Sequence, residues 1–361
     1  KGMVVNIEST VNSIKRAVEE AELMAGVDIG NVYTGIAGGH IKGFNSNGVV
    51  AVKDQEVCQA DIDRVLGAAK TLSIPDDQKI LHVLPQGFII DGQDCINEPL
   101  GMSGVRLEVI VHIITGAVTA AQNIEKSIQR AGLEMAEMIL QPIASSEAIL
   151  TPEEKELGVA VVDIGGGTTD IATFVDGAIR HTAVIPIGGA HFTNDISIGL
   201  RTPRADAEKI KIRYGCASVD LLDENELIEV PSVGGRPPRH LSSQLLAEII
   251  EPRAEEIFTL VGQEIEKMGD KDRIAAGVVI TGGTSSFRGM ADVAERILGL
   301  PVRVGVPTGV GGLIDVVGTP AFSTGVGLCL YAFRSRKKKE TPRNGKQHVF
   351  QTMSTWFKGF F

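Results

Sequence analysis

Three glycines stand between two aspartates in the segment 163–170, which reads DIGGGTTD. Consecutive glycines let the backbone bend sharply and bring several N–H groups onto one anion, because no Cβ blocks the approach. The hydroxyls of Thr168 and Thr169 add donors, and Asp163, at the end of an apolar strand, suits a water-mediated grip on Mg²⁺. The segment predicts a phosphate-binding loop, although a plain hairpin turn is the alternative. Its glycines are Gly165, Gly166 and Gly167.

A second glycine pair follows another apolar strand, in the segment 277–284, which reads GVVITGGT. At Gly282 and Gly283 the backbone can lie flat against an adenine or a ribose, and a helix that starts beyond Thr284 would face the phosphates. The pair alone is a weak signal, since such turns are common. Together with the first loop it predicts a site for ATP with Mg²⁺.

Strands and helices alternate around the two loops, which predicts an α/β fold. Near the loops we expect strands at 158–164, 169–175, 178–187 and 275–281, and helices at 192–199, 204–214 and 242–267. Before them we expect helices at 8–24, 119–131 and 144–150, strands at 32–37 and 137–140, and a last helix at 324–334. Residues 40–117 form a compact α+β unit with separate strands at 80–84, 87–91 and 105–114.

Composition and charge exclude some classes of protein. A chain of 361 residues with 43% hydrophobic and 22% charged residues is typical of a globular protein with more than one domain. The net charge of −10 argues against nucleic-acid binding, because phosphates must be neutralised by a basic surface. The four cysteines stand singly, so neither a disulfide framework nor a zinc site is predicted, and a reducing cytosol is the default.

The C-terminal segment has the opposite charge to the body. From Arg334 onward there are eight Lys or Arg and a single acid, Glu340. Within 349–361 apolar side chains recur at helical spacing, with polar ones opposite, as in a helix lying in a bilayer interface beside anionic lipid. The alternative is a helix docked on the protein's own core, from which a basic linker would separate it. The residues predicted to touch the membrane are Phe350, Met353, Trp356, Phe357, Lys358 and Phe360.

The two glycine loops together resemble the second phosphate loop and the adenosine motif of the actin superfamily of ATPases. The resemblance implies a two-lobed fold with ribonuclease H-like halves. It places a water-orienting polar residue at Gln141, for which a solvated strand end is an equal alternative. It places ribose contacts at Glu208 and Lys211, which share one helix face at i and i+3. The superfamily's first phosphate loop is not evident in this sequence.

Other segments closely resemble the FtsA family of bacterial cell-division proteins. They are 21–26 (AELMAG), 81–86 (LHVLPQ), 100–106 (LGMSGVR) and 230–239 (VPSVGGRPPR). The resemblance spans residues 1–334 and implies that roughly the first 45 residues of the family, with the first phosphate loop, are absent. It divides the chain into a first lobe (1–39 and 118–157), a relocated subdomain (40–117), a second lobe (158–334, with a smaller subdomain at about 192–270), a basic flexible linker (335–348) and the membrane-targeting helix (349–361).

The family resemblance also implies partners. It predicts actin-like filaments, contacts of residues 40–117 with later division proteins, and binding of the C-terminal peptide of the tubulin-like protein FtsZ, with Arg253 at that site. A salt bridge from Arg253 to Glu251 or Glu256 is an equal alternative. The function implied is an ATP-binding membrane tether for the FtsZ ring at the cytoplasmic face of the septum, with at most weak ATPase activity. The alternatives are a pilus-assembly adaptor or a small-molecule kinase or phosphatase of the same superfamily.

Overall fold

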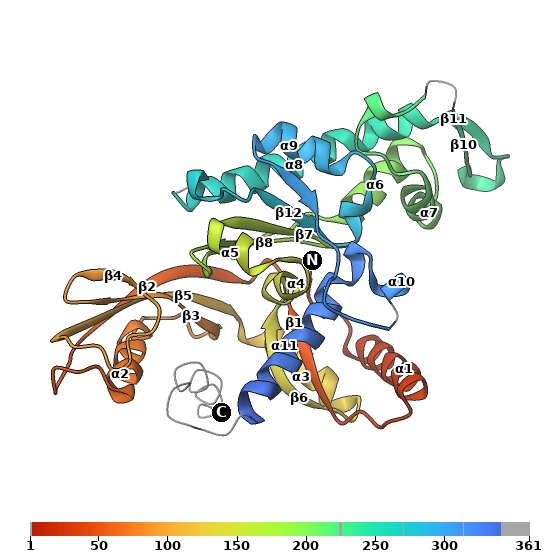
Figure 1. Cartoon of the computed structure of the whole chain (residues 1–361). Coiled ribbons are helices and arrows are strands. Elements are labelled where there is room, and N and C mark those ends of the chain that lie inside the picture. The colour runs from red at the N-terminus through yellow and green to blue at the C-terminus, as the bar shows by residue number, and fades with distance from the viewer. Residues whose placement is uncertain (1, 224–225, 270, 313, 341–361) are drawn as a thin grey trace.

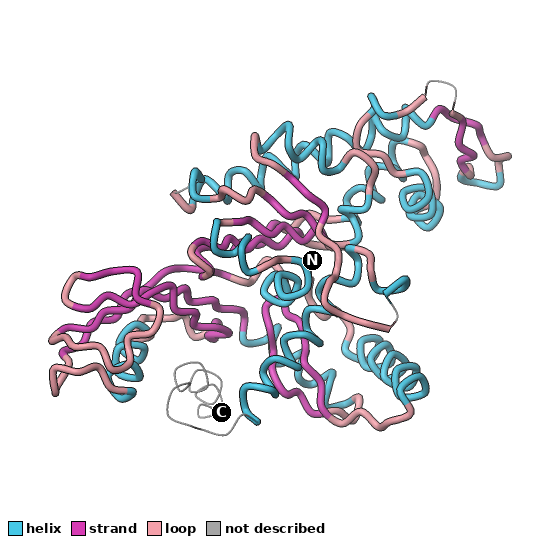
Figure 2. Tube along the Cα trace, viewed as in Figure 1, coloured by secondary structure: helices cyan, strands magenta, loops and turns pink. Residues whose placement is uncertain are grey.

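The computed structural model describes residues 2–223, 226–269, 271–312 and 314–340. The helices and strands form two lobes and a third, strand-rich unit that extends to one side (Figure 1 and Figure 2). Three hydrophobic cores correspond broadly to these units. The first lobe's core also includes residues from one face of the second-lobe sheet, so the two lobes pack directly on each other.

The second lobe is built on a five-stranded sheet of order β13-β12-β7-β8-β9. Its strands are β7 (Val159–Ile164), β8 (Thr169–Val175), β9 (Ala178–Ile185), β12 (Val278–Thr281) and β13 (Val302–Val304). The first three strands are antiparallel and the last two run parallel to β7, which is the strand order of a ribonuclease H-like half. Its helices are α6 (Gly189–Gly199), α7 (Arg204–Tyr214), α8 (Ser243–Lys267) and α9 (Met290–Leu298), and a hairpin of β10 (Leu227–Val230) and β11 (Arg239–Ser242) lies at its far end (Figure 1).

The first lobe contains a two-stranded parallel sheet among the described residues. Its strands are β1 (Asn31–Ile36) and β6 (Glu134–Leu140). Its helices are α1 (Ile7–Ala25), α3 (Val118–Arg130), α4 (Gln141–Ile149), α5 (Pro152–Leu157) and α11 (Ser323–Glu340), and the short α10 (Ile314–Val317) precedes α11. Helix α11 crosses α4 so closely that a Cβ atom at Gly327 would lie 1.8 Å from the Ala144 carbonyl oxygen. Glycine at position 327 therefore allows the two helices to touch.

The third unit is an antiparallel sheet of order β2-β5-β3-β4 with one helix packed on it. Its elements are β2 (Lys42–Ala51), α2 (Gln59–Ala69), β3 (Gln78–Ile90), β4 (Gln93–Ile96) and β5 (Arg106–Ala117). Adjacent residues of β5 serve different cores, because side chains alternate across a strand: Ile113 packs in this unit, and Ile114 packs in the core of the first lobe. The unit is thus joined to the first lobe by apolar packing. We call it the inserted domain.

Several predicted elements differ from the observed ones. The strands expected at 80–84 and 87–91 are one strand, β3, because irregularities in pairing at Ile80/His82 and Pro85/Gly87 accommodate the proline. Helix α6 begins at Gly189 rather than 192, directly on the glycine loop. Helix α11 continues to Glu340, into the expected linker, because Lys and Arg are good helix formers and favour a helix C-terminus.

Candidate functional site

The predicted phosphate loop is the turn between β7 and β8. The Gly165 amide donates to the Thr168 carbonyl at 2.9 Å, which closes the turn, and Asp163 faces Asp170 across the hairpin. The amides of Gly166 and Gly167 donate no hydrogen bond to any described residue. Two unpaired N–H groups side by side on a glycine turn form a concave donor surface for an anion.

The N-terminus of α6 packs directly on this loop. The amides of Gly189 and Ala190 donate to the carbonyls of Gly165 and Gly166 at 2.9 and 2.7 Å. A Cβ atom at Gly188 would lie 2.6 Å from the Gly165 carbonyl oxygen, so only glycine fits there. The ring of His191 accepts the Gly188 amide at 3.1 Å and caps the helix. The loop is therefore fixed from behind by a helix start.

The second glycine pair lies against the same loop. Strand β12 pairs with β7, and Thr281 faces Asp163. Gly282 has a φ of +85°, and a Cβ atom there would lie 2.5 Å from Asp163 Oδ1. The Thr284 hydroxyl donates to the Gly165 carbonyl at 3.3 Å. Gly283 opens a short 3₁₀ turn, so the two predicted loops meet edge to edge.

The Asp163 carboxylate is buried where β7, α4 and α11 meet. Its Oδ2 accepts from the hydroxyls of Ser145 at 2.6 Å and Thr324 at 3.0 Å. Burial raises the pKa of Asp163, and the two hydroxyl hydrogen bonds oppose that rise. Neither hydroxyl was identified from the sequence, because each comes from an element far from residue 163 along the chain.

Asp170 is buried beside Asp163 and is incompletely paired. Its Oδ2 accepts from the Thr168 hydroxyl at 2.8 Å, whereas Oδ1 has no partner among the described residues. Burial raises the pKa of Asp170 to about 7, and the charge of Asp163 adds to the rise. No ion pair from a described Lys, Arg or His reaches either carboxylate. A buried pair of carboxyl groups without a cation is costly unless a proton or a metal joins it.

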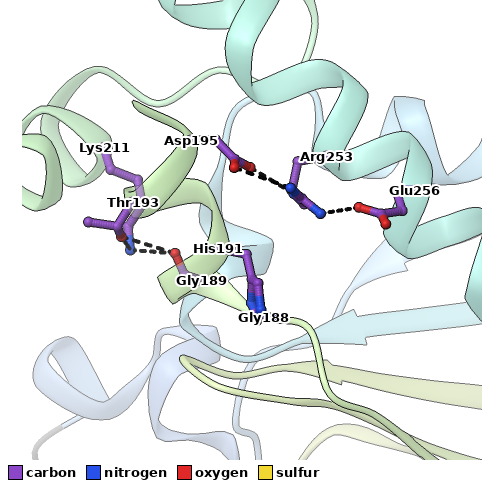
Figure 3. A network of polar contacts seen from close by, with 8 residues as sticks. All are labelled: Gly188, Gly189, His191, Thr193, Asp195, Lys211, Arg253 and Glu256. Carbon is purple, nitrogen blue, oxygen red and sulfur yellow. Dashed lines mark hydrogen bonds and ion pairs between the residues drawn. The ribbon is translucent and has the colours of Figure 1, made fainter. Parts of the chain in front are cut away.

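Glu208 and Lys211 belong to α7, and their side chains reach the start of α6, as Figure 3 shows for Lys211. The Lys211 ammonium uses its three donors on the Gly189 carbonyl (3.1 Å), the Thr193 hydroxyl (2.9 Å) and Glu208 Oε2 (2.7 Å). Burial tends to raise the pKa of Glu208, but hydrogen bonds from Lys211 and Thr193 outweigh it and hold the pKa below its usual value. Glu208 Oε1 accepts no hydrogen bond from the described residues and remains available.

Two other predicted residues have different surroundings. Gln141 is the first residue of α4 at the carboxyl end of β6, and a Cβ atom at Gly35 would lie 3.1 Å from its Cγ. Its side chain forms no hydrogen bond with the described residues, so the structure places it at the end of the first-lobe sheet without a partner. The Thr169 hydroxyl donates to the Ile187 carbonyl at 2.9 Å and points away from the loop.

Arg253 on α8 is bound by two carboxylates (Figure 3). Its Nε and Nη2 donate to Asp195 of α6 at 2.7 and 3.1 Å, and its Nη1 pairs with Glu256 on its own helix. Glu251 instead pairs with Arg296. Of the two salt bridges that the sequence suggested, the one with Glu256 is present, and the bidentate bond to Asp195 was not foreseen.

The predicted membrane-contact residues, from Phe350 to Phe360, lie outside the described residues. None of the described helices combines the length and the apolar character needed to cross a bilayer.

Comparison with known proteins decides the family. The family described as "Cell division protein FtsA" matches residues 160–327, and the one described as "SHS2 domain inserted in FTSA" matches residues 38–115. The cell division protein FtsA of Pseudomonas aeruginosa is 54% identical over 370 residues, which span 100% of this chain and 89% of that protein. The chain belongs to the FtsA family. Its Escherichia coli K12 relative is 44% identical over 369 residues, covering 99% of this chain and 86% of that FtsA.

Solved structures support the fold that the FtsA family implies. The structure of a PilM-PilN type IV pilus biogenesis complex matches with a TM-score of 0.59 at 18% identity, over 91% of this chain and 86% of that one. MreB5 of Spiroplasma citri bound to ADP matches with a TM-score of 0.51 at 19% identity, over 63% of this chain and 68% of that one. These likenesses confirm the predicted actin-like α/β fold, and the match of the SHS2 domain to residues 38–115 confirms the inserted domain. Membership of the FtsA family favours cell division over the pilus and kinase alternatives.

Proposed function

We propose that this member of the FtsA family binds ATP between β7–β8 and β12. The observation that carries the proposal is the meeting of three glycine segments, at Gly165–Gly167, Gly188–Gly189 and Gly282–Gly283, around unpaired amides. Backbone N–H groups at a helix start are a common phosphate-binding arrangement. Glu208, with one free carboxylate oxygen near the same helix start, suits a ribose hydroxyl. The actin-like relative MreB5 was solved with ADP, which supports a nucleotide here.

Asp163 and Asp170 are proposed to help bind the Mg²⁺ ion that accompanies the nucleotide. Among the described residues there is no group of three or more His, Cys, Asp or Glu that could hold a metal ion alone. A Mg²⁺ ion near Asp163 and Asp170 would therefore take most of its ligands from water and from nucleotide phosphates, as Mg²⁺ usually does. The cation would also offset the cost of burying two carboxylates with no basic partner.

Gly166→Val tests the loop directly. A Cβ atom at Gly166 meets nothing within 4 Å, so the substitution adds a side chain to open space in front of the loop without disturbing the core. We expect loss of ATP binding, measured by calorimetry with Mg²⁺, and an almost unchanged melting temperature. Gly67→Val is the matched control, because Gly67 also faces open space but lies on α2 of the inserted domain. ATP affinity equal in wild type and Gly166→Val would contradict the proposed site.

The second part of the proposal is membrane tethering by the C-terminal segment. Its support is the sequence alone: a basic stretch after Arg334 and an apolar stripe within 349–361. Trp356→Glu places a charge on that stripe, whereas Ser354→Glu places the same charge on the opposite face. We expect Trp356→Glu to abolish co-sedimentation with anionic liposomes and Ser354→Glu to weaken it only slightly. Equal loss in both variants would indicate a charge effect and not a buried helix face.

The third part concerns the FtsZ peptide and self-assembly. Arg253 is already bound by Asp195 and Glu256, so an acidic peptide must compete with them. Glu256→Gln removes the more exposed competitor and is expected to strengthen binding of an FtsZ C-terminal peptide, while Arg253→Ala abolishes it. Peptide binding that ignores both changes would remove Arg253 from the site.

We further propose that ATP controls filament formation, with the inserted domain contacting the next protomer and later division proteins. In this proposal the protein works at the cytoplasmic face of the inner membrane at the septum, and ATP hydrolysis is at most slow. ATP-dependent pelleting that is lost in Gly166→Val tests the first point. Pelleting that is equal with and without ATP would contradict it.

A further inference from the structure

The inserted domain touches both lobes, through two different kinds of contact. On the first lobe, Ile41, Leu81 and Ile114 of the inserted domain join the apolar core. In the same place the Leu140 amide donates to His82 Nε2 at 3.0 Å. Leu140 is the last residue of β6, directly before Gln141. This contact therefore fixes the end of the strand that carries the predicted water-orienting residue.

On the second lobe the contact is polar and lies along the edge strand β9. The Gln86 amide group donates to the carbonyls of Ile179 and Arg180 at 3.0 and 3.3 Å, and to Asn45 Oδ1 at 3.0 Å. The His112 ring lies between Asn45 Oδ1 at 2.7 Å and the Thr182 hydroxyl at 2.9 Å. Edge strands expose unpaired backbone groups, and here two of them are covered by a side chain of the inserted domain.

The polar network has one consistent arrangement of protons. Asn45 Oδ1 can only accept, so His112 must carry its proton on Nδ1. His112 Nε2 then has a free lone pair and accepts the hydroxyl proton of Thr182. Burial lowers the pKa of His112 to about 4, which keeps the ring neutral in this arrangement. Asn45 Oδ1 accepts from both Gln86 and His112, whereas each ring nitrogen of His112 has one partner among the described residues, so loss of the Thr182 hydroxyl leaves His112 Nε2 unpaired.

The fit at this contact leaves no room for one more carbon atom. A Cβ atom at Gly43 of β2 would lie 2.4 Å from Thr182 Oγ1 and 2.8 Å from His112 Nε2. Any side chain at position 43 must therefore displace the Thr182 hydroxyl or the His112 ring, the two groups that pair across this contact. A single methyl group at this position is thus enough to disturb the hydrogen bond between the inserted domain and the second lobe.

Strand β9 leads from this contact to the glycine loop. It ends at Ile185, and the chain then passes through Ile187, whose carbonyl accepts the Thr169 hydroxyl, to Gly188 and Gly189 behind the loop. The inserted domain is thus connected through β9 to the glycine loop and through Leu140 to the strand end before Gln141, which form the two walls of the proposed nucleotide site.

We infer that the inserted domain acts as a strap that holds the two walls of the nucleotide site in register, with His82 and His112 as positioning residues. Of the two measurements that test it, hydrogen exchange and ATP affinity, only ATP affinity rests on the proposed ATP site. Releasing the second-lobe end of the strap loosens the wall at 188–190, where the amides of Gly189 and Ala190 pair with the loop. A looser wall holds the phosphates less firmly, so ATP affinity falls although no residue that would touch ATP has changed.

Two pairs of variants test the strap in the whole 361-residue chain. Thr182→Val removes the hydroxyl that His112 accepts and keeps the side-chain shape, whereas Thr182→Ser keeps the hydroxyl. Gly43→Ala displaces the Thr182 hydroxyl or the His112 ring at the β2–β9 contact, whereas Gly67→Ala adds the same methyl group to open space. Hydrogen exchange is followed by mass spectrometry in peptides covering 42–51, 178–185 and 186–199, and ATP affinity is measured by calorimetry.

For Thr182→Val and Gly43→Ala we expect faster exchange at the β2–β9 contact and also in 186–199. We expect ATP affinity to fall by about fivefold or more, the lower range of coupling between linked sites. Thr182→Ser and Gly67→Ala should match the wild type within about twofold, a difference well below such coupling. Rescue by Thr182→Ser identifies the hydrogen bond, because serine loses more packing than valine does.

Two results distinguish a failure of the strap proposal from a failure of the proposed nucleotide site. If exchange rises at 42–51 and 178–185 but stays unchanged in 186–199, the strap is overturned, because the contact has opened without loosening the wall. If exchange rises in all three peptides but wild type binds no ATP, the strap stands and the proposed nucleotide site is wrong. Unchanged exchange in every peptide of Gly43→Ala would also overturn the strap, since the contact would then not be tight.

Discussion

The molecule buries titratable side chains in two regions and satisfies them differently. His112, at the contact of the inserted domain with β9, is 1% exposed and has a partner on each ring nitrogen. Asp170, beside the glycine loop, is 2% exposed and has a partner on only one oxygen. A buried polar group without a partner is costly, so the His112 ring is complete as it stands and the Asp170 carboxylate lacks a partner. The difference favours a structural contact between units at His112 and a ligand-binding site at Asp170.

The two regions also respond to pH with opposite sign. Burial and the charge of His181 lower the pKa of His112 to about 4, so its contribution to stability is present above pH 6.5 and is lost as pH falls toward 4. Burial raises the pKa of Asp170 from 3.8 to about 7, so its contribution is present below pH 3.8 and is lost as pH rises toward 7. The histidine favours the folded chain near neutrality, and the aspartate favours it in mild acid.

Asp170→Asn should give the largest effect. The amide cannot ionise, so the cost of a buried carboxylate disappears at high pH. Without nucleotide and divalent cations, we expect the variant to be more stable than wild type by about 4 kcal/mol at pH 8, and by much less at pH 5. Urea denaturation at both pH values measures this difference. A gain of equal size at pH 5 would mean that ionisation of Asp170 is not the cause.

His112→Gln should remove the part of the stability loss in acid that protonation of His112 causes. Wild type is expected to lose about 3 kcal/mol through this residue between pH 6.5 and 4. The glutamine variant starts from a lower stability at pH 7, because it cannot reproduce both hydrogen bonds, but its stability should fall less steeply with acid. Parallel pH profiles of the two proteins would show that His112 is not the titrating group.

Gln86→Met tests how much the polar contact contributes without changing charge or volume greatly. The carbonyl of Ile179 loses its side-chain donor and stays covered, so we expect a loss of about 2 kcal/mol in the free energy of unfolding. Ile114→Ala, at the apolar contact with the first lobe, is the comparison, since its cost rests on lost packing and has no hydrogen-bond component. A Gln86→Met protein as stable as wild type would mean that water replaces the lost bond.

Gly67→Ala belongs to neither region and should have the smallest effect. It lies inside α2 with nothing within 4 Å of the new methyl group, so alanine's greater helix propensity should stabilise the chain by up to about 1 kcal/mol. Thermal melting measures the gain. A loss of stability would mean that the variant disturbs the inserted domain and cannot serve as the control used above.

The sequence predicted those parts of the site whose residues lie close together along the chain. The loop at 163–170 carries its glycines, hydroxyls and acids together, and Glu208 and Lys211 share a helix face because of their spacing. The structure brings these residues together around the start of α6. The tail, which has an equally continuous pattern, remains a prediction.

The sequence did not predict the interactions that depend on contacts between distant segments of the chain. Ser145 and Thr324 reach Asp163 from two helices, and either residue alone reads as an ordinary small polar residue. Asn45, Gln86 and His112 each interrupt a strand of the inserted domain, where alternation accounts for a polar side chain without any special role. Only the register of these three strands with one another, together with their hydrogen bonds to β9, shows that they form one network.

The bonds to Asp163 have a consequence for the order in which the protein folds. One partner lies 18 residues before it and the other 161 residues after it. A chain emerging from the ribosome can form the β7–β8 hairpin early, yet Thr324 reaches the carboxylate only after almost the whole second lobe has been made. We therefore expect the glycine loop to gain its final geometry late in synthesis, when α11 closes over it.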